Sequence, residues 1–349
     1  MGKKDRKDKE KKDEKAKLPR VSICTPTFNR RPFFKGLIDS IMAQNYPKDK
    51  IEWIIVDDGS DKIEDLVKDI PFVKYFYTKK MPLGRKRNFM HDQCSFKNDN
   101  DIIIYFDDDD YYPKERISHA VDKLTGSSAL CAGSSEIYIW FNTLNKMYRF
   151  GPYGPNHATA GPFAFKRELL KHTSYENDAL LAEEKHFLKN YTIPFIQLDP
   201  LKTILVISHE QNTFDKRRLI SADNKQCNES ALKPQNFIKN KELFDFYIEN
   251  LPKLLTTYDE GSVSNKPEVL AEIDRRDKER LMQGQGQTQV TTRNPDGTTR
   301  ILQTHEIIQA LQNVTNESLE IKKQNDLLQS KINMMEQIIR NNNLQHFFS

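Results

Sequence analysis

The sequence predicts an α/β fold in which a mostly parallel sheet is flanked by helices. Runs rich in Ile, Val, Phe and Tyr alternate with amphipathic patterns of helical period between residues 19 and 106, as βαβ units require. Polar or charged clusters directly follow several of these runs, at the strand ends where open α/β sheets bind ligands. The first turn lacks a G-x-G-x-x-G pattern, which excludes a dinucleotide-binding Rossmann domain.

The first half of this domain is predicted from β-rich runs and from the helical patterns between them. Pro32 stands at the first turn of the first helical pattern, a position that favours a helix start. The expected strands lie at 19–25, 51–56, 72–78 and 101–106, and the expected helices at 32–44, 61–70 and 83–94.

The second half of the domain contains shorter apolar runs and a Gly/Pro-rich stretch. Residues 151–170 are predicted to form a loop, a short strand and the start of a helix. The other expected strands lie at 129–134, 136–141, 146–150, 192–199 and 202–212, and the other expected helices at 115–124 and 180–190. These elements complete a domain of residues 19–220.

Three further segments follow the domain. Residues 221–282 are predicted to be a polar helical extension, and residues 283–304 a linker and a β-hairpin around Asn-Pro-Asp-Gly. Residues 305–342 are predicted to form a coiled coil that makes the protein a homo-oligomer; the alternative is a single amphipathic helix packed on the domain. The apolar residues at seven-residue spacing are Ile307, Val314, Ile321, Leu328 and Met335, and the residues four positions further on are Leu311, Ser318, Asn325, Ile332 and Ile339.

The charge balance argues against nucleic acid as a partner. Residues 1–18 carry nine Lys/Arg and five Asp/Glu, which accounts for the whole net charge of +4 and predicts a disordered tail. No apolar segment is long enough for a signal peptide or a membrane span, so a cytoplasmic location is expected. The four cysteines lack metal-type spacing and fit a reducing compartment.

Four consecutive carboxylates, Asp107–Asp110, directly follow the buried-type run Ile102–Phe106. Clustered carboxylates at a strand end repel one another unless a cation neutralises them, and hard oxygen ligands suit Mg²⁺ or Mn²⁺. The alternative is a solvated acidic loop, with Asp110 capping the helix that follows Pro113.

Other clusters stand at neighbouring strand ends. Thr25–Arg30 follows the first strand, Asp57–Ser60 the second, and Gly84–Asn88 the third. Each alone is weak evidence, since a DDGS segment also suits a turn and a basic segment also suits a solvated helix face. Together they bring carboxylates, loop backbone and Arg/Lys to one crevice, as a nucleoside diphosphate with its metal needs.

In this order the motifs resemble the inverting glycosyltransferases of family 2, which have the GT-A fold. The resemblance extends over residues 19–215. It is carried by PTFNR (26–30), VDDGS (56–60), GRKRN (84–88), FDDDD (106–110) as the D-x-D motif, LLAEEKHFL (180–188) and VISHEQN (206–212). The Lys/Asn/Ile-rich composition is similar to soluble copies in large DNA viruses, for which the host cytoplasm or the virion is the expected location.

The resemblance implies a nucleotide and metal site. The backbone of Thr25, Pro26, Thr27 and Phe28 would pack against the nucleoside, and Asp57 or Asp58 would hold the base and ribose. Arg87 would neutralise diphosphate charge. Asp107 and Asp109 would be the D-x-D pair, with Asp108 beside the nucleotide. The metal ligands, to Mn²⁺ or Mg²⁺, would be Asp109, Asp107 and His209.

The resemblance also implies a catalytic base on the acidic segment. Glu184 is expected to take the proton of the acceptor hydroxyl, and Glu183 to bind the acceptor. The predicted activity is hexosyl or N-acetylhexosaminyl transfer from a nucleotide-sugar, UDP-linked by expectation, to a glycan, protein or small-molecule hydroxyl. Two alternatives remain, a nucleotidyltransferase and a catalytically inactive sugar-binding or scaffold protein assembled by the coiled coil.

Overall fold

The computed structural model describes residues 17–220, 224–284, 291–293, 299–302 and 304–341. The chain divides into two compact units, Met1–Ile273 and Asp274–Ser349. The predicted N-terminal tail lies outside the described residues, except for its last two positions.

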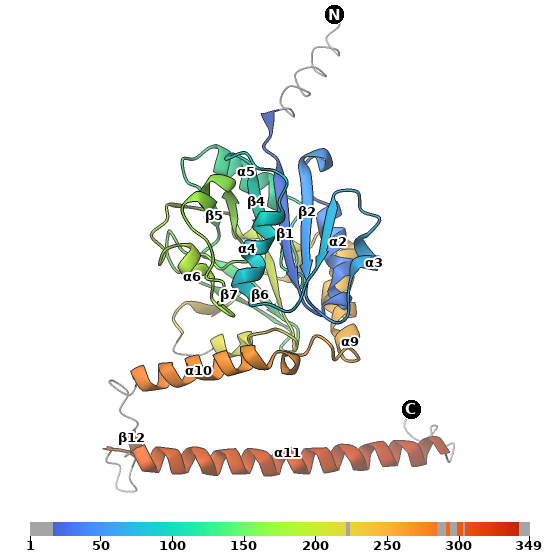
Figure 1. Cartoon of the computed structure of the whole chain (residues 1–349). Helices are drawn as coiled ribbons and strands as arrows, with labels where there is room; N and C mark the ends of the chain where they lie inside the picture. The colour runs from blue at the N-terminus through green and yellow to red at the C-terminus, as the bar shows by residue number, and fades with distance from the viewer. Residues whose placement is uncertain (1–16, 221–223, 285–290, 294–298, 303, 342–349) are drawn as a thin grey trace, which may run out of the picture. The chain divides into compact units, whose positions relative to one another are not determined.

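The first unit is built on a seven-stranded mixed sheet (Figure 1). The parallel strands of its first half are expected from the sequence, whereas β8 runs antiparallel to both of its neighbours. In spatial order the strands are β3 (Val73–Tyr77), β2 (Ile51–Asp57), β1 (Val21–Thr27), β4 (Ile102–Tyr105), β8 (Ala164–Lys166), β5 (Cys131–Gly133) and β9 (Phe195–Gln197).

Alternation along the strands divides the core into two layers. Val21 and Ile23 pack with the apolar faces of α2 (Phe34–Met42) and α5 (Arg116–Thr125), whereas Cys24 packs on the opposite face with α4 (Leu83–Gln93). Because successive side chains of a strand point to opposite faces of the sheet, apolar residues on both faces pack against helices. The predicted α/β fold with flanking helices is confirmed.

A second, four-stranded sheet was not expected from the sequence. Its order is β10 (Leu205–Ser208), β6 (Ile137–Phe141), β7 (Lys146–Phe150) and β11 (Cys227–Glu229). One face of this sheet is covered by the extension, where Trp140 and Leu205 pack with apolar residues of 237–251. The covering helices are α7 (Pro234–Phe237), α8 (Lys241–Asp245), the π-helical turn Phe246–Asn250 and α9 (Leu251–Leu255).

Several predicted elements are shorter than expected. The helix predicted at 61–70 is reduced to α3 (Glu64–Val67), and that at 180–190 to α6 (Glu184–Phe187). The extension predicted to be helical also contains β11, because residues 227–229 pair with β7 and form the edge of the second sheet. Short 3₁₀ turns at 31–33, 48–50, 167–171, 200–202, 216–219 and 263–265 connect the elements.

The second unit contains a hairpin and a long helix. Strands β12 (Thr291–Arg293) and β13 (Thr299–Ile301) pair antiparallel, as predicted, and α11 extends over Thr304–Asn341. Helix α10 (Pro267–Gly284) crosses the boundary between the units. Within the described ranges no helix is both long and apolar enough to cross a bilayer.

Candidate active site

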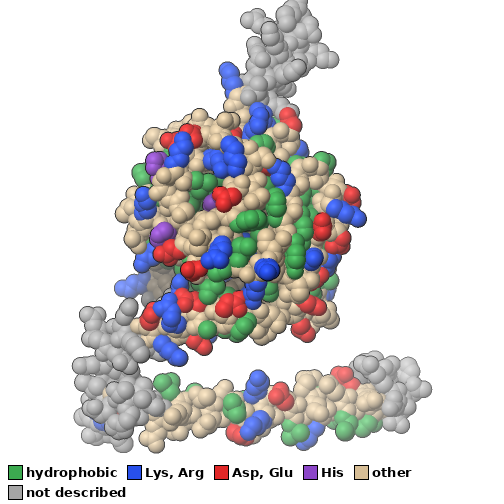
Figure 2. Space-filling model, in the orientation of Figure 1, with side chains coloured by type: hydrophobic (Ala, Val, Ile, Leu, Met, Phe, Trp, Pro, Cys, Tyr) green, Lys and Arg blue, Asp and Glu red, His purple; other side chains and the backbone are tan. Residues whose placement is uncertain are grey.

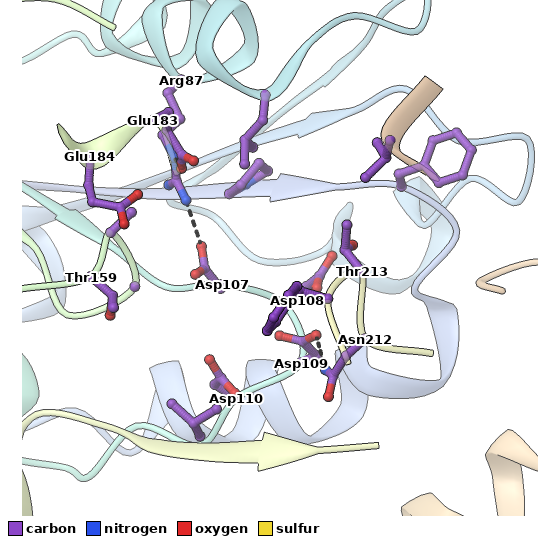
Figure 3. Close-up of a pocket in the computed structure, with 18 of the residues that line it drawn as sticks. Arg87, Asp107, Asp108, Asp109, Asp110, Thr159, Glu183, Glu184, Asn212 and Thr213 are labelled. Atoms are coloured by element: carbon purple, nitrogen blue, oxygen red, sulfur yellow. Dashed lines mark hydrogen bonds and ion pairs between the residues drawn. The ribbon is translucent and has the colours of Figure 1, made fainter. Parts of the chain in front are cut away.

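The parallel strands β2, β1 and β4 end at one edge of the main sheet, beside a cavity of about 470 Å³. Figure 3 shows the acidic run after β4 between Glu183 and Glu184 on one side and Asn212 and Thr213 on the other. The charged residues that line the cavity are Arg30, Lys80, Lys86, Arg87, Lys216, Lys266, Asp58, Asp107, Asp108, Asp109, Asp110, Glu183, Glu184 and Glu268.

The end of β1 contributes Pro26, Thr27 and Phe28 to the cavity wall. Thr25, also predicted to contact the nucleotide, lies in the core instead. Its hydroxyl donates to the carbonyl of Phe106 at 2.7 Å and accepts from the indole N–H of Trp53 at 2.9 Å. Thr25 therefore joins β1 to its neighbours and does not line the cavity.

The two carboxylates after β2 have different surroundings. Asp57 does not line the cavity, because its oxygens accept from Gly59 N at 2.9 Å, Ile63 N at 3.2 Å and the Tyr75 hydroxyl at 2.8 Å. Asp58 lines the cavity and accepts from Met81 N at 3.0 Å and from the Lys86 ammonium. Of the two candidates for base and ribose recognition, only Asp58 can reach a ligand in the cavity.

The first three carboxylates of the acidic run all line the cavity. One oxygen of Asp107 lies 3.5 Å from an Arg87 nitrogen, and Asp108 lies 3.8 Å from Arg30. Burial, together with the neighbouring charge of Asp109, raises the pKa of Asp108 to about 7. The backbone of Gly161 approaches Asp107 so closely that a Cβ there would lie 3.0 Å from its carboxylate.

The structure contradicts the helix-capping alternative for Asp110. Helix α5 begins only at Arg116, and its first turn has no side-chain cap. Asp110 instead accepts from the backbone N–H of Ile207 in β10 at 3.0 Å, while its carbonyl accepts from the Tyr247 hydroxyl at 3.1 Å. Asp110 therefore fixes the acidic loop to the second sheet, and burial raises its pKa.

Asp109 meets residues from the loop after β10. Its Oδ2 lies 3.2 Å from His209 Nε2 and 3.3 Å from the Asn212 amide nitrogen. His209 does not line the cavity itself; its ring lies behind Asp109, 4.7 Å from the ring of Phe33. Burial lowers the pKa of His209 to about 4, so the imidazole is neutral at pH 7, the form that binds metals.

Arg87 links the acidic run to the two glutamates. Its Nε lies 2.7 Å from Glu183, and both side chains are buried, at 3% and 4% exposure. Burial opposes the charge of Arg87, but the carboxylates of Glu183 and Asp107 raise its pKa well above the ordinary value. Arg87 thus forms ion pairs with Glu183 and Asp107 inside the protein, whereas the sequence predicted only that it would neutralise the charge of a diphosphate.

Backbone geometry orients the two glutamates. Ala182 has a φ of 52°, a left-handed conformation that costs a residue with a side chain of order 1 kcal/mol. Asn88 in α4 donates to the carbonyl of Tyr175 at 2.9 Å and accepts from its N–H at 3.0 Å, which anchors the loop that leads to Glu183. The glutamates therefore project from a backbone held in place by α4.

The charges of the cavity favour a divalent cation. Six Lys/Arg face eight Asp/Glu, a formal excess of two negative charges before any ligand enters. The Oδ1 of Asp107, which lies 3.5 Å from an Arg87 nitrogen, is buried and makes no hydrogen bond within the described part of the chain. Within that same part, no three His, Cys, Asp or Glu side chains, including the predicted ligands Asp107, Asp109 and His209, lie together so that they could hold a metal ion, so further ligand oxygens would have to come from the nucleotide or from water.

Several lining residues were missed by sequence reasoning. Lys86 donates to Asp58, and it lies in the GRKRN segment, in which the sequence pattern singled out only Arg87. Asn212 lies in the VISHEQN segment. Lys266 and Glu268 come from the polar extension, and no local pattern marks them because they reach the cavity only through the fold.

Comparisons with known proteins agree with this geometry. Residues 22–180 match the family model described as Glycosyl transferase family 2. A Campylobacter jejuni protein named GalNAc(5)-diNAcBac-PP-undecaprenol beta-1,3-glucosyltransferase is 36% identical over 101 residues, which are 27% of this chain and 30% of that protein. The probable glycosyltransferase YdaM of Bacillus subtilis is 27% identical over 109 residues, 30% of this chain and 26% of that protein. The chain thus matches less than a third of the length of either relative.

Solved structures give weaker likenesses. S. aureus TarS 1–349 is 17% identical with a TM-score of 0.44, over 81% of this chain and 96% of that one. The mannosyltransferase PcManGT from Pyrobaculum calidifontis, solved with GDP-Man and Mn²⁺, is 16% identical with a TM-score of 0.45, over 78% of this chain and 81% of that one. The likeness to the Glycosyl transferase family 2 therefore rests on the sequence match of residues 22–180.

Proposed function

We propose that this protein is a metal-dependent inverting glycosyltransferase with a GT-A type arrangement, which moves a sugar from a UDP-linked donor to a hydroxyl acceptor. The observation that supports it most is the convergence of Asp58, Asp107–Asp109 and Glu183–Glu184 around one cavity. Both curated relatives carry glycosyltransferase names. Hexosyl or N-acetylhexosaminyl groups are the donor sugars that we propose.

The nucleoside would occupy the part of the cavity beside the end of β1. Phe28 offers an aromatic face there, with the ammonium groups of Lys80 and Lys266 at 4.8 and 5.2 Å from its ring centroid. The Asp58 carboxylate could accept the N–H of a uracil ring, since carboxylate oxygens can accept more than one hydrogen bond. This is the basis for proposing a UDP-linked donor.

The side chains that could coordinate a metal in this cavity suit a hard divalent cation such as Mn²⁺ or Mg²⁺. Asp109 and Asp107 are candidate ligands, and His209 is a neutral imidazole beside Asp109. When bound, such an ion would supply Lewis-acid stabilisation of the leaving diphosphate. The negative excess of the cavity would otherwise repel a nucleotide diphosphate.

Glu184 is the better candidate for the base of the two glutamates. Glu183 is held by Arg87 at 2.7 Å, and a carboxylate paired with a guanidinium is a weaker proton acceptor. Glu184 lines the same cavity. Its carboxylate would take the acceptor's hydroxyl proton as the oxygen attacks the anomeric carbon from the face opposite the diphosphate.

The test is release of nucleoside diphosphate from a panel of nucleotide-sugars with Mn²⁺. The proposal predicts release by the wild type with at least one donor and none by Asp109→Ala, with the fold of the variant checked by circular dichroism. A scaffold protein would release no diphosphate from any donor. A nucleotidyltransferase would instead release pyrophosphate from a nucleoside triphosphate and a sugar phosphate. Either result would reject the proposal.

We propose further that α11 pairs with a second copy of itself. The described residues at seven-residue spacing, Val314, Ile321, Leu328 and Met335, are 62%, 58%, 55% and 55% exposed within one chain. Figure 2 shows hydrophobic side chains on the surface of this helix. A second helix of the same sequence would bury this row of apolar residues by knobs-into-holes packing.

Sedimentation equilibrium tests this self-association. The wild type is expected to sediment as an oligomer, and Leu328→Asp as a monomer, because a carboxylate in the seam would be desolvated. Glu320→Gln, on the same exposed helix but outside the row, should leave the mass unchanged. A monomeric wild type, or an unchanged mass in Leu328→Asp, would contradict the proposal.

A further inference from the structure

A segment outside the matched family domain completes the cavity. Residues 258–269 follow α9, lie more than 70 residues after the matched range ends at residue 180, and contribute Lys266, Glu268 and Val269 to the lining. We refer to residues 258–269 as the closing segment.

The closing segment is attached to the loops that follow strands β1 and β2. Beyond β1, Asn29 donates to the carbonyl of Glu260 at 3.0 Å and Arg30 to that of Gly261 at 3.3 Å. Beyond β2, Asp61 accepts from the Tyr258 hydroxyl at 2.7 Å. These contacts join positions about 200 residues apart.

Neighbouring loops lie so close to the backbone of Gly261 that a side chain would not fit at this position. A Cβ there would lie 2.4 Å from Gln211 Oε1 and 2.8 Å from the carbonyl oxygen of Asn29. The start of the segment is therefore fitted tightly against the loops after β1 and β10, which fixes the position of the residues that follow it.

Lys266 is placed by this attachment inside the cavity. Its ammonium donates to the Thr213 hydroxyl at 3.2 Å and lies 5.2 Å from the centroid of the Phe28 ring. Burial lowers the pKa of Lys266 to about 7, and the charge of Arg30 adds to this effect. The negative charges of Asp108 and Asp109 act on this pKa in the opposite direction.

The buried cations of the cavity have carboxylate partners. Lys86 pairs with Asp58, Arg87 with Glu183, and Arg30 with Asp108. Lys80 pairs with Glu268 at 2.7 Å. Within the described residues, Lys266 has no carboxylate within ion-pair distance. A partly buried ammonium without a counterion is costly, and an anion that enters the cavity would offset this cost.

We infer that Lys266 binds the diphosphate of the nucleotide-sugar donor and so acts as a donor-binding residue supplied by the closing segment. This inference rests on the proposed function. Its ammonium would form a charge-assisted hydrogen bond to a phosphate oxygen. In the proposed arrangement this phosphate would lie between a base near Phe28 and a metal ion near Asp109. The same bond would stabilise the negative charge that develops on the diphosphate as the sugar leaves.

Binding by isothermal titration tests the inference, with uridine, UMP, UDP and GDP in the presence of Mn²⁺. Lys266→Met should weaken UDP binding by about 10- to 100-fold, the factor expected for loss of one charged hydrogen bond. Uridine binding should change by less than about threefold, because the nucleoside lacks the phosphates. Lys266→Arg should recover most of the affinity, and Lys253→Met, an exposed lysine of α9, should bind like the wild type.

The thermal midpoint without nucleotide separates binding from folding. Lys266→Met is expected to melt at or above the wild-type temperature, because it replaces a partly buried charge by an apolar side chain of similar length. Equal UDP affinity in Lys266→Met and the wild type would overturn the role of Lys266 alone. A parallel loss of uridine and UDP binding would also overturn it, by indicating a nucleoside contact. A wild type that binds no nucleoside diphosphate would overturn the proposed function itself.

Discussion

Replacing Arg87 with methionine is expected to destabilise the fold in addition to stopping transfer. The guanidinium lies 2.7 Å from Glu183 and 3.5 Å from Asp107, and the side chains of Arg87 and Glu183 are only 3% and 4% exposed. Methionine would keep most of the volume but leave Glu183 charged, buried and without its cation. Removing one partner of a buried ion pair costs about 3–5 kcal/mol. At roughly 2–4 °C per kcal/mol for a unit of this size, the melting temperature should fall by about 6–20 °C.

A double-mutant cycle makes this reasoning quantitative. In Arg87→Met/Glu183→Gln the unpaired charge is gone, so at least half of the lost stability should return, although transfer should stay impaired. Denaturant unfolding of the four proteins at pH 7 gives the coupling free energy between the two residues. Arg85→Met is the matched control, since Arg85 is 54% exposed and pairs with Asp178 on the surface. Melting of Arg87→Met at the wild-type temperature, or a double mutant no more stable than Arg87→Met, would refute the argument.

Two other predictions concern the base and a buried histidine. Glu184→Gln should bind UDP as the wild type does but lose turnover by about 10²- to 10⁴-fold, and the same phenotype in Glu183→Gln instead would show that the base is assigned to the wrong residue. Burial, with the charge of Arg87 adding to it, lowers the pKa of His91 to about 3 in the fold, whereas an unfolded histidine titrates near 6.5. The contribution of His91 is thus complete above about pH 6.5 and falls as the pH drops toward 3, by about 1.4 kcal/mol per pH unit. The unfolding free energy of His91→Gln, measured between pH 7 and pH 5, should fall less steeply than that of the wild type; parallel slopes would contradict this.

The strand-end carboxylates could be located from the sequence because their signals are local. An apolar run that ends in Asp marks both a strand and its carboxyl end, which was enough to predict β1, β2 and β4 and the acidic run. The difference between Asp57 and Asp58 was not predictable, because it depends on the Tyr75 hydroxyl from the neighbouring strand β3 and on Lys86 from α4. The cap predicted for Asp110 was wrong because β10, almost 100 residues later, supplies a stronger partner.

The remaining features depend on contacts between distant parts of the chain. The division into two sheets follows from pairing of β6 with β10, which are about 65 residues apart in sequence. Lys266 lies in a polar helical region whose composition gives no indication of a ligand. Such residues are recognised only when the folded chain brings them to the cavity.

The attachment of the closing segment also affects the order in which the site can form during synthesis. The strand ends and both glutamates are present once residue 184 has been made, but Lys266 arrives more than 80 residues later. At typical rates of about 5–20 residues per second, the donor side of the cavity would stay open to water for several seconds. A nascent chain could therefore build its sheet and acidic loop before it is able to hold a nucleotide.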